Sequence, residues 1–485
     1  MRGLRRGGLW AAAGGVALCT GLGGAASAET LLDALALAYQ TNPTLQSERA
    51  QLRALDESYI QARAGLRPQV SASAEFDHTK SPLTEEDIDE QASASVTVSQ
   101  SLYTGGSVTA QMRAAMNDIE SGRQKLRETE AAVFQAVIQA YEDVRRDQQS
   151  VLIGEDGIAA LRRQLDETDA RFRAGDLTRT DQAEAQARLA AAQAQLATAQ
   201  AQLQISRSNY VVAVGQAPAD LAEPAPLQGV PVTVDEAFDA TDHNNGGVLS
   251  AEYAERAAAQ RVAQAKAANR PTLSLQATYG ESGAVRIQGL YGYTQNLIPG
   301  ANITASAVFT QPLFTGGMNS SRIREALEND NVQTIAIETA RRQAVQAVAQ
   351  SWAQLLAARA GVTSYQKQVD ADEVAFDGAR QEAQAGLRTT IDVLNEEQEL
   401  NAARLALVGA KHDEYIAEAD ILDATGRLEA RYILSGVKLY DPAKTFKKNV
   451  DGGIGIPWDG PVMALDALGA PGAPKAAKAG AEVLP

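Results

Sequence analysis

The sequence has few cysteines and histidines and lacks the common catalytic and phosphate-binding motifs. Its 485 residues include a single cysteine, Cys19, so no disulfide can form within the chain and stability must come from packing or assembly. Its three histidines, His78, His243 and His412, are far apart and form no H-E-x-x-H pattern. Neither G-x-S-x-G nor G-x-x-x-x-G-K occurs. Because these patterns mark common metalloproteases, hydrolases and phosphate-binding loops, we predict no enzyme, no catalytic residue and no cofactor.

A metal site is not predicted either. The nearest pattern is D-H-N-N-G-G at 242–247, which begins like a calcium-binding loop. With Gly247 at position 6 of such a loop, position 12 is Tyr253, where the loop requires a bidentate glutamate. The acidic run between residues 85 and 90 is interpreted as a solvated loop.

Long apolar runs are absent after residue 28, so the sequence predicts no membrane-spanning helix. Residues 1–28 combine three arginines at the start, an apolar stretch over 9–22 and A-S-A before Glu29. This order predicts a secretory signal peptide over 1–28. Lipid attachment at Cys19 is disfavoured because the preceding residue is a bulky leucine.

Basic residues are also outnumbered. The net charge is −16, and removal of the three arginines in the signal peptide leaves −19. Because phosphate repels such a chain, nucleic acid is not a predicted partner.

What the sequence does contain is a long internal repeat. Q-S-L-Y-T-G-G at 100–106 returns as Q-P-L-F-T-G-G at 311–317, an offset of 211 residues. The same offset places Gly215 on Gly426 without a gap. Copies of this length are too long for a solenoid unit. We predict repeat 1 over 29–230, repeat 2 over 231–430, and a partly disordered C-terminal segment over 431–485.

Each copy contains two stretches of strict alternation between apolar and polar residues. This period of two predicts strands with one apolar face, each about as long as the roughly 9–11 residues that a tilted strand needs to cross a bilayer. The predicted strands span about 68–79 and 91–103 in repeat 1, and about 271–281 and 302–314 in repeat 2. The segments between them, 80–90 and 281–301, are polar or glycine-rich, as expected for outer loops.

The remainder of each copy is predicted to be helical. The predicted helices span about 31–66, 106–173 and 178–215 in repeat 1, and about 235–269, 317–384 and 389–427 in repeat 2. A single helix over 106–173 would be roughly 100 Å long. The heptad series of Leu189, Leu196, Leu203 and Tyr210 predicts a coiled-coil seam, whereas Glu414 interrupts the matching series of repeat 2.

The repeated T-G-G phrase is predicted to be the junction between a membrane strand and a long helix. The aromatic residue before it suits a membrane interface, and the glycines permit the backbone change that the junction requires. The predicted junction residues are Tyr103, Gly105 and Gly106 in repeat 1, and Phe314, Gly316 and Gly317 in repeat 2.

Four strands cannot close a barrel, and open sheet edges are not tolerated in lipid, so assembly is required. Two copies would supply eight strands, and three copies would supply twelve, enough to leave a lumen. The predicted fold class is therefore mainly α with a small β part, built from two tandem repeats. Each repeat contributes two membrane strands and a long helical hairpin.

The chain resembles the TolC family of outer-membrane export proteins over about residues 30–430. The resemblance rests on A-Y-Q-T-N-P at 38–43, the two T-G-G phrases and G-L-R-T-T-I-D-V-L at 386–394. It implies a homotrimer with a twelve-stranded outer-membrane barrel and a periplasmic helical barrel. It also implies docking on an inner-membrane transporter and a periplasmic adaptor, and export of proteins or small toxic molecules.

The resemblance also implies a gate at the periplasmic tip. Arg388 matches an arginine that ties neighbouring helices, and Asp392 matches an aspartate of the constriction ring. Asn395 stands where a second ring aspartate is expected, and Ala383 where a tyrosine is expected. From the residues alone, Asp181 and Asp392 each end a T-x-x-D capping box. We interpret Asp181 as a helix cap and Asp392 as pore-lining in a trimer, with capping left open for Asp392.

Two other functions are compatible with parts of the sequence. A passive porin would use the strands but not the long helical hairpins. A structural coiled-coil stalk would use the helices but not four alternating strands in matched pairs. Neither explains the duplication, so an outer-membrane exit duct is the preferred function.

Overall fold

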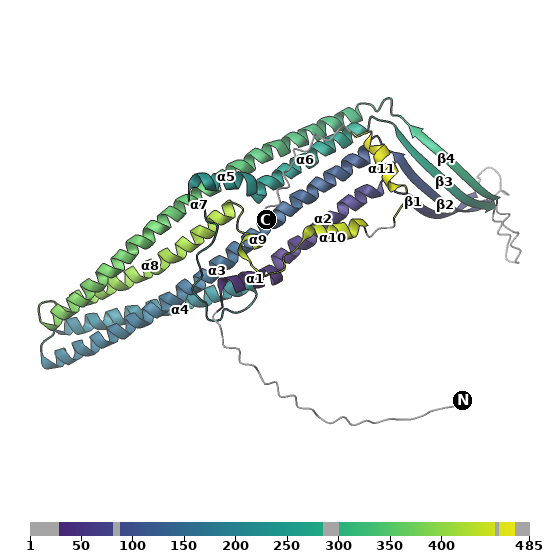
Figure 1. Cartoon of the computed structure of the whole chain (residues 1–485). Helices are drawn as coiled ribbons and strands as arrows, with labels where there is room; N and C mark the ends of the chain where they lie inside the picture. Colours follow the sequence, from purple (N-terminus) through teal and green to yellow (C-terminus); the bar gives the residue numbers. More distant parts are fainter. Residues whose placement is uncertain (1–28, 81–87, 285–299, 452–454, 471–485) are drawn as a thin grey trace, which may run out of the picture.

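The computed structural model describes residues 29–80, 88–284, 300–451 and 455–470. The predicted signal peptide, parts of both predicted outer loops and the end of the C-terminal segment lie outside the described residues. The molecule is elongated, with one sheet at one end and two helical hairpins whose turns form the other end (Figure 1).

The sheet is antiparallel and has the order β1-β2-β3-β4. Its strands are β1 (Gln69–Lys80), β2 (Ile88–Tyr103), β3 (Thr272–Ala284) and β4 (Gly300–Thr310). The central pair, β2 and β3, joins the two repeats, and the hydroxyls of Thr97 and Thr278 are 3.1 Å apart across it. β4 ends at Thr310 instead of continuing to 314, because Pro312 has no N–H to donate to a ladder.

Repeat 1 forms helices α1 (Leu31–Thr41), α2 (Pro43–Ala64), α3 (Ser107–Ala174) and α4 (Arg179–Val214). Repeat 2 forms α5 (Val234–Asn244), α6 (Gly246–Ala267), α7 (Met318–Gln384) and α8 (Thr390–Ala424). The C-terminal segment adds α9 (Ala430–Ile433), α10 (Pro442–Asp451) and α11 (Asp459–Ala467). None of the described helices has the length and hydropathy needed to cross a membrane.

The single helices expected over 31–66 and 235–269 are wrong, because each is divided in two by an asparagine. Asn42 is extended, since the residue before a proline avoids the helical region, and its side chain accepts a hydrogen bond from the Thr44 amide at 2.9 Å. Asn245 is extended in the same way and accepts from the Val248 amide at 3.1 Å. Each asparagine therefore ends one helix and caps the next.

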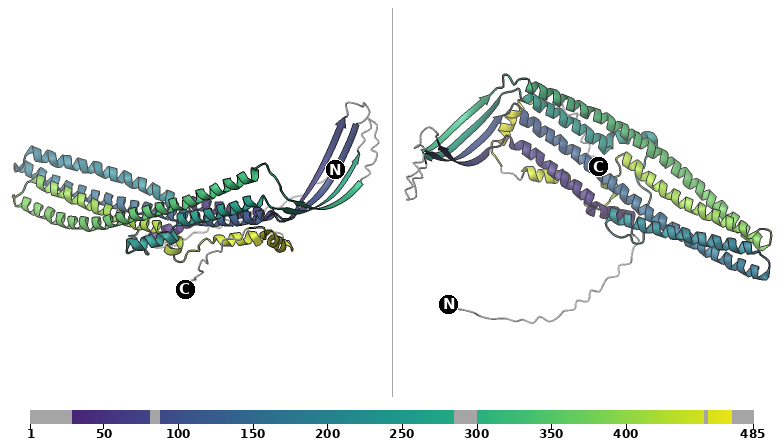
Figure 2. Two further views of the ribbon diagram at one scale, coloured as in Figure 1. Left: turned by 90° about the horizontal axis from the view of Figure 1, so that it is seen from above. Right: turned by 180° about the vertical axis from the view of Figure 1, so that it is seen from behind.

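Four helices, α2, α3, α6 and α7, continue the four strands as a layer in the same order (Figures 1 and 2). The main core lies under the middle of this layer, around Phe134, Tyr141 and Tyr210, which are fully buried. The Tyr141 hydroxyl donates to the Ala222 carbonyl at 2.7 Å, and the Tyr210 hydroxyl donates to Glu29 at 2.7 Å. The Tyr141 hydroxyl also donates to the Glu29 carbonyl at 2.9 Å, so Tyr141 of α3 and Tyr210 of α4 together hold both ends of repeat 1 against its helical hairpin.

The heptad seam of α4 packs against α3, with Ala185, Leu203 and Tyr210 buried. In repeat 2 the interrupting Glu414 forms an ion pair with Arg359 of α7 at 3.6 Å. A charged residue is tolerated in that seam because its partner comes from the facing helix.

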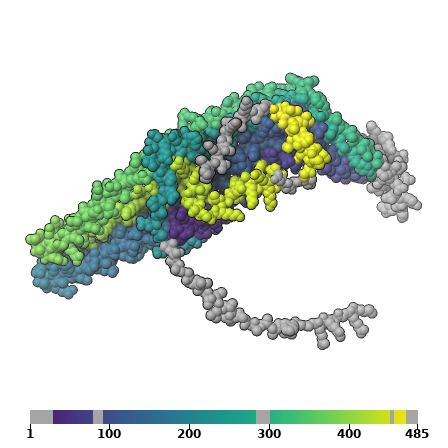
Figure 3. All heavy atoms as spheres, in the orientation of Figure 1, coloured from purple at the N-terminus to yellow at the C-terminus, as the bar shows by residue number. Residues whose placement is uncertain are grey.

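The C-terminal helices lie on one side of the helical layer, where Figure 2 shows α10 and α11 along α2 and the start of the sheet. Phe446 of α10 packs edge-on against Tyr59 of α2. Figure 3 shows α11 lying over the place where the first strand pair meets the helices. Residues 442–451 and 459–467 are thus folded parts of the molecule.

Candidate functional site

The first candidate site is the tip, where the two hairpin turns lie together at the end opposite the sheet (Figure 1). Here Arg188 of α4 joins the hairpins. Its guanidinium donates to Asn395 at 3.1 Å and to Gln398, both on α8, while its Nε pairs with Glu184 at 3.0 Å. Asn395 therefore accepts a hydrogen bond between repeats at the position where the resemblance expects an aspartate.

Asp181 and Asp392 both cap the helix that follows the turn. Asp392 accepts from the Thr389 amide at 3.0 Å and from the Thr389 hydroxyl at 2.6 Å, while its own amide donates to that hydroxyl. Asp181 makes the same three bonds with Thr178. These hydrogen bonds from threonine lower the pKa of both carboxyls, so both are charged at neutral pH.

Arg388 is held within its own hairpin. Its guanidinium pairs with Glu382 of α7 at 2.7 Å and with Glu396 of α8 at 3.6 Å. The three side chains are 32–50% exposed, so solvent weakens these pairs and they can exchange for others.

A buried carboxyl, Glu397, lies one turn beyond the tip residues. It is 5% exposed, and its Oε1 has no hydrogen-bond partner among the described residues. Burial raises its pKa to about 7, and Arg163 of α3 offsets only part of this effect. Glu397 borders a cavity of about 530 Å³ between α3, α7 and α8.

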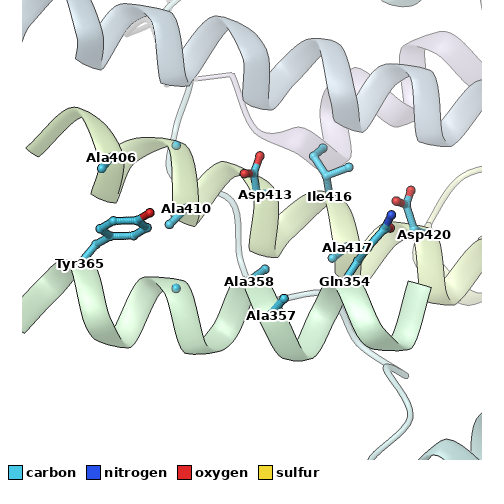
Figure 4. Close-up of a pocket in the computed structure, with 12 residues that line it drawn as sticks. Gln354, Ala357, Ala358, Tyr365, Ala406, Ala410, Asp413, Ile416, Ala417 and Asp420 are labelled. Carbon is cyan, nitrogen blue, oxygen red and sulfur yellow. The ribbon is translucent and has the colours of Figure 1, made fainter. Parts of the chain in front are cut away.

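A second cavity, of about 590 Å³, lies farther along the α7–α8 pair. Tyr365 of α7 points toward Ala406 and Ala410 of α8, and the acids Asp413 and Asp420 lie along the same stretch of α8 (Figure 4). Small residues on both helices leave this space between them. Among the described residues, no group of three or more His, Cys, Asp or Glu side chains is placed to hold a metal ion.

The junction of repeat 1 holds a carboxylate. Asp466 of α11 is 0% exposed and accepts from the amides of Thr104 at 2.6 Å, Gly106 at 3.3 Å and Thr109 at 3.1 Å. It also accepts from the hydroxyls of Thr104 and Thr109, both at 2.7 Å. Burial would raise the pKa of Asp466, but the hydrogen bonds from the amides and hydroxyls of Thr104 and Thr109 lower it overall. Asp466 thus caps the start of α3.

A second aspartate of α11, Asp459, attaches the same segment to α2. Its Oδ2 pairs with Arg63 at 2.6 Å and with Arg67 at 2.9 Å. The segment after α11 also packs closely on the junction glycines. If Gly106 were replaced by a residue with a side chain, its Cβ would lie 2.4 Å from the Ala470 nitrogen. The Tyr103 hydroxyl lies in the same contact, because it would be 2.5 Å from a Cβ added at Gly469.

The junction of repeat 2 has the same backbone but different surroundings. Gly316 and Gly317 have φ values of 63° and 85°, against 69° and 85° for Gly105 and Gly106. Apart from the adjoining backbone, no atom of the described residues would lie within 4 Å of a Cβ added at Gly316 or Gly317, and Phe314 is 90% exposed. The two copies of the phrase therefore fold alike but are covered differently.

The residues predicted for the gate lie at the hairpin turns, and those predicted for the junctions lie between strand and helix. Sequence reasoning missed Arg188, Glu397, Asp459 and Asp466. Arg188 follows Asp181 by seven residues, a spacing that puts both on one helix face, so this signal was available. No local signal marks the other three, because their roles depend on contacts with distant parts of the chain.

Comparison with known proteins gives consistent matches. A family model described as outer membrane efflux protein matches residues 34–216 and 239–427, one segment in each repeat. Outer membrane efflux protein BepC of Brucella suis biovar 1 is 32% identical over 435 residues, covering 90% of this chain and 93% of BepC. Outer membrane protein TolC of Escherichia coli K12 is 25% identical over 453 residues, covering 89% of each.

The fold matches solved structures as well. The outer membrane protein VceC of Vibrio cholerae superposes with a TM-score of 0.70 at 20% identity, covering 82% of this chain and 96% of VceC. The predicted fold class, mainly α with a small sheet and two tandem repeats, is confirmed.

Proposed function

The chain belongs to the outer membrane efflux protein family, and from this premise we propose that three copies form the exit duct of a tripartite efflux pump or type I secretion system. It is an outer-membrane channel protein whose helical part extends into the periplasm. The family is one of channels, and the proposed duct performs no catalysis, needs no cofactor and takes its energy from its partners.

The main support for a trimer comes from the open edges of the four-stranded sheet. Its four strands form one continuous order, and within the part of the chain that the structure describes, the edge strands β1 and β4 each have one side without a partner strand. In lipid such edges must be paired. The layer of helices has matching edges, α2 beside β1 and α7 beside β4, so one contact between copies can close both parts. Three copies supply twelve strands, which leaves a lumen.

The proposed gate is at the hairpin tips. In a trimer, three Asp392 carboxylates would meet near the axis and favour cations, while Arg388 would exchange its pairs with Glu382 and Glu396 for a neighbouring helix. Asp181 acts as a helix cap, and Asn395 joins α8 to α4 through Arg188. The capping bonds of Asp392 support this arrangement because they fix a charged carboxylate at the tip.

The proposed partners are an inner-membrane transporter and a periplasmic adaptor, which would meet the helical hairpins. The proposed processing removes residues 1–28. Residues 29–230 and 231–430 act as the two repeats, and 431–485 as a C-terminal segment that includes α10 and α11. At both junctions, the phrase ending in Gly106 or Gly317 sets the boundary between barrel and duct.

Electrophoresis tests the assembly. The purified protein should migrate as a trimer in mild detergent and as a monomer after heating, because the shared barrel satisfies the strand edges. A stable monomer that keeps the β-strand signal in circular dichroism would contradict the shared barrel.

Gene deletion tests the role. Loss of the duct should increase sensitivity to bile salts, dyes or antibiotics, or stop secretion of a protein that lacks a cleaved signal. A defect restricted to uptake of small nutrients would instead support the passive porin.

A further inference from the structure

The carboxylate-binding arrangement at the first junction is present twice in this chain. In repeat 1 the donors to Asp466 are Thr104, Gly106 and Thr109. The 211-residue offset places Thr315, Gly317 and Ser320 at the same positions, and the Thr109-to-Ser320 change keeps the hydroxyl. Both copies therefore carry the same set of amides and hydroxyls.

The two copies also share their geometry. In each, the first glycine pair is left-handed, and the next bonds have the same pattern: Ser107 to Thr104 and Met318 to Thr315. The three amides consequently point out of the start of α7 as they do from α3. In repeat 1 this arrangement holds an anion with five hydrogen bonds, which shows what the second copy can bind.

No segment of the described chain takes the place of Asp466 in repeat 2. Within residues 29–80, 88–284, 300–451 and 455–470, no hydrogen bond involves the amides of Thr315, Gly317 or Ser320. Among the described residues, α11 supplies the aspartate for repeat 1 and does not reach the matching donors of repeat 2. An anion for the second copy must therefore come from outside these residues.

We propose that Thr315, Gly317 and Ser320 bind the phosphate of a phospholipid headgroup in the periplasmic leaflet of the outer membrane. The proposal rests on the membrane location in the proposed function.

Three observations favour a lipid over another anion. The arrangement directly follows β4, so it lies where the sheet ends. The two residues before Thr315, Leu313 and Phe314, are 93% and 90% exposed, which gives acyl chains an apolar surface next to the donors. Arg324 is exposed and follows Gly317 by seven residues, so it lies on the same face of α7 as the donors, where a guanidinium can meet a phosphate.

A neighbouring copy in the proposed trimer would leave this face accessible. At the first junction, two different faces are covered: a Cβ on Gly105 would meet Arg270 after α6, whereas one on Gly106 would meet Gly469 after α11. A neighbouring copy at the α7 edge corresponds to α6, so it would cover Gly316. The face of Gly317 and Ser320 corresponds to α11 and remains available to lipid.

Native mass spectrometry of the full-length protein in a phosphate-free detergent tests this site. Dihexanoylphosphatidylglycerol should bind in a saturable manner, at least about tenfold more tightly than inorganic phosphate, because headgroup and acyl chains act together. Ser320→Asp should weaken lipid binding by about tenfold or more, since it places a negative charge where the phosphate lies while suiting the helix start. Ser364→Asp, an exposed change on the same helix, is the matched control and should bind like wild type.

Three results would overturn the proposal. Equal lipid binding by Ser320→Asp and wild type would place the lipid elsewhere. Equal affinity for inorganic phosphate would make the site a free-anion site, and tighter binding of a peptide with the sequence of residues 455–470 would make it a protein-docking site. Single-channel conductance of the wild-type preparation tests the proposed function separately. If the wild type forms channels but any of these three results is found, the lipid site is wrong and the channel function stands.

Discussion

His412 of α8 lies 3.1 Å from Asp143 of α3, a polar contact between the long helix of repeat 1 and the returning helix of repeat 2. Its other ring nitrogen is 2.9 Å from Asp413. Burial would lower the pKa of His412, but the hydrogen bonds with Asp143 and Asp413 raise it overall. The two carboxylates therefore favour the charged form of the imidazole.

This pair predicts a pH dependence of stability. Because the folded pKa of His412 is above its unfolded value, its stabilisation is complete below that unfolded value and is lost as pH rises through the folded pKa. His412→Gln should cost about 1 kcal/mol of unfolding free energy near pH 6 and much less near pH 8. Urea unfolding followed by circular dichroism measures it, with His243→Gln as the exposed control. A cost that does not vary with pH would contradict the ion pair.

At Glu397, unlike at His412, removal of the titrating group should stabilise the protein. Its pKa is raised by burial to about 7, so its charge opposes folding, and stability falls as pH rises from the unfolded value toward 7. Glu397→Gln should therefore stabilise the protein near pH 8 by about 1–2 kcal/mol, allowing for contact with solvent, and have little effect near pH 4. Unfolding at both pH values measures this, and Glu399→Gln, an exposed neighbour, should change neither. Destabilisation near pH 8 would show that Glu397 has a partner.

The contribution of the five hydrogen bonds to Asp466 at the first junction should be measurable by substitution of Asp466. Asp466→Asn removes the charge and places an amide where five donors converge, so unfolding free energy should fall by about 2–3 kcal/mol. Hydrogen exchange should increase at residues 104–109 more than at 315–320. Asp377→Asn, an exposed aspartate of α7, is the control. Unchanged exchange at 104–109 would mean that α11 does not cap α3.

Two substitutions at the tip should distinguish the role of Arg388 in closure from the role of Asp392 in ion selectivity. Arg388→Ser should raise single-channel conductance by loosening the closed tip. Asp392→Ala should mainly reduce cation preference and block by trivalent metal complexes applied from the periplasmic side. Neighbouring Asp392 carboxylates would repel by about 1 kcal/mol per pair at 4 Å in a water-like dielectric, so other bonds must hold the tip closed. If both variants conduct, select and block like wild type, residues 386–395 are only a capped helix start.

Arg188 offers an independent test of the tip. Arg188→Gln removes its ion pair with Glu184 and weakens its bonds to Asn395 and Gln398, so the two hairpins should separate more easily and conductance should rise. Asn395→Asp should have the reverse effect, because it converts the Arg188 contact into an ion pair. A matched control is Arg342→Gln, because the ion pair that Arg342 makes among the described residues is with Glu338 of its own helix.

The sequence alone determined the parts whose information is local. Alternation in 92–99 and in 272–279 predicts strands because side chains of a strand point to opposite faces in turn. The glycines at 105–106 and 316–317 mark the junctions because only glycine readily adopts their left-handed backbone. The T-x-x-D patterns predicted the caps at Asp181 and Asp392, which need only three consecutive peptide units.

Tertiary structure decided what depends on distant residues. Asp466 meets Thr104 across 362 positions, so no window of sequence could show that one junction is clamped and its copy is not. Glu397 has the composition of a solvated helix residue, and only the packing of α3 and α7 around it shifts its pKa. Arg188 and Asn395 become partners only because the two hairpins end side by side. Local preferences set the elements, but the chain path sets which charges meet and which are left exposed.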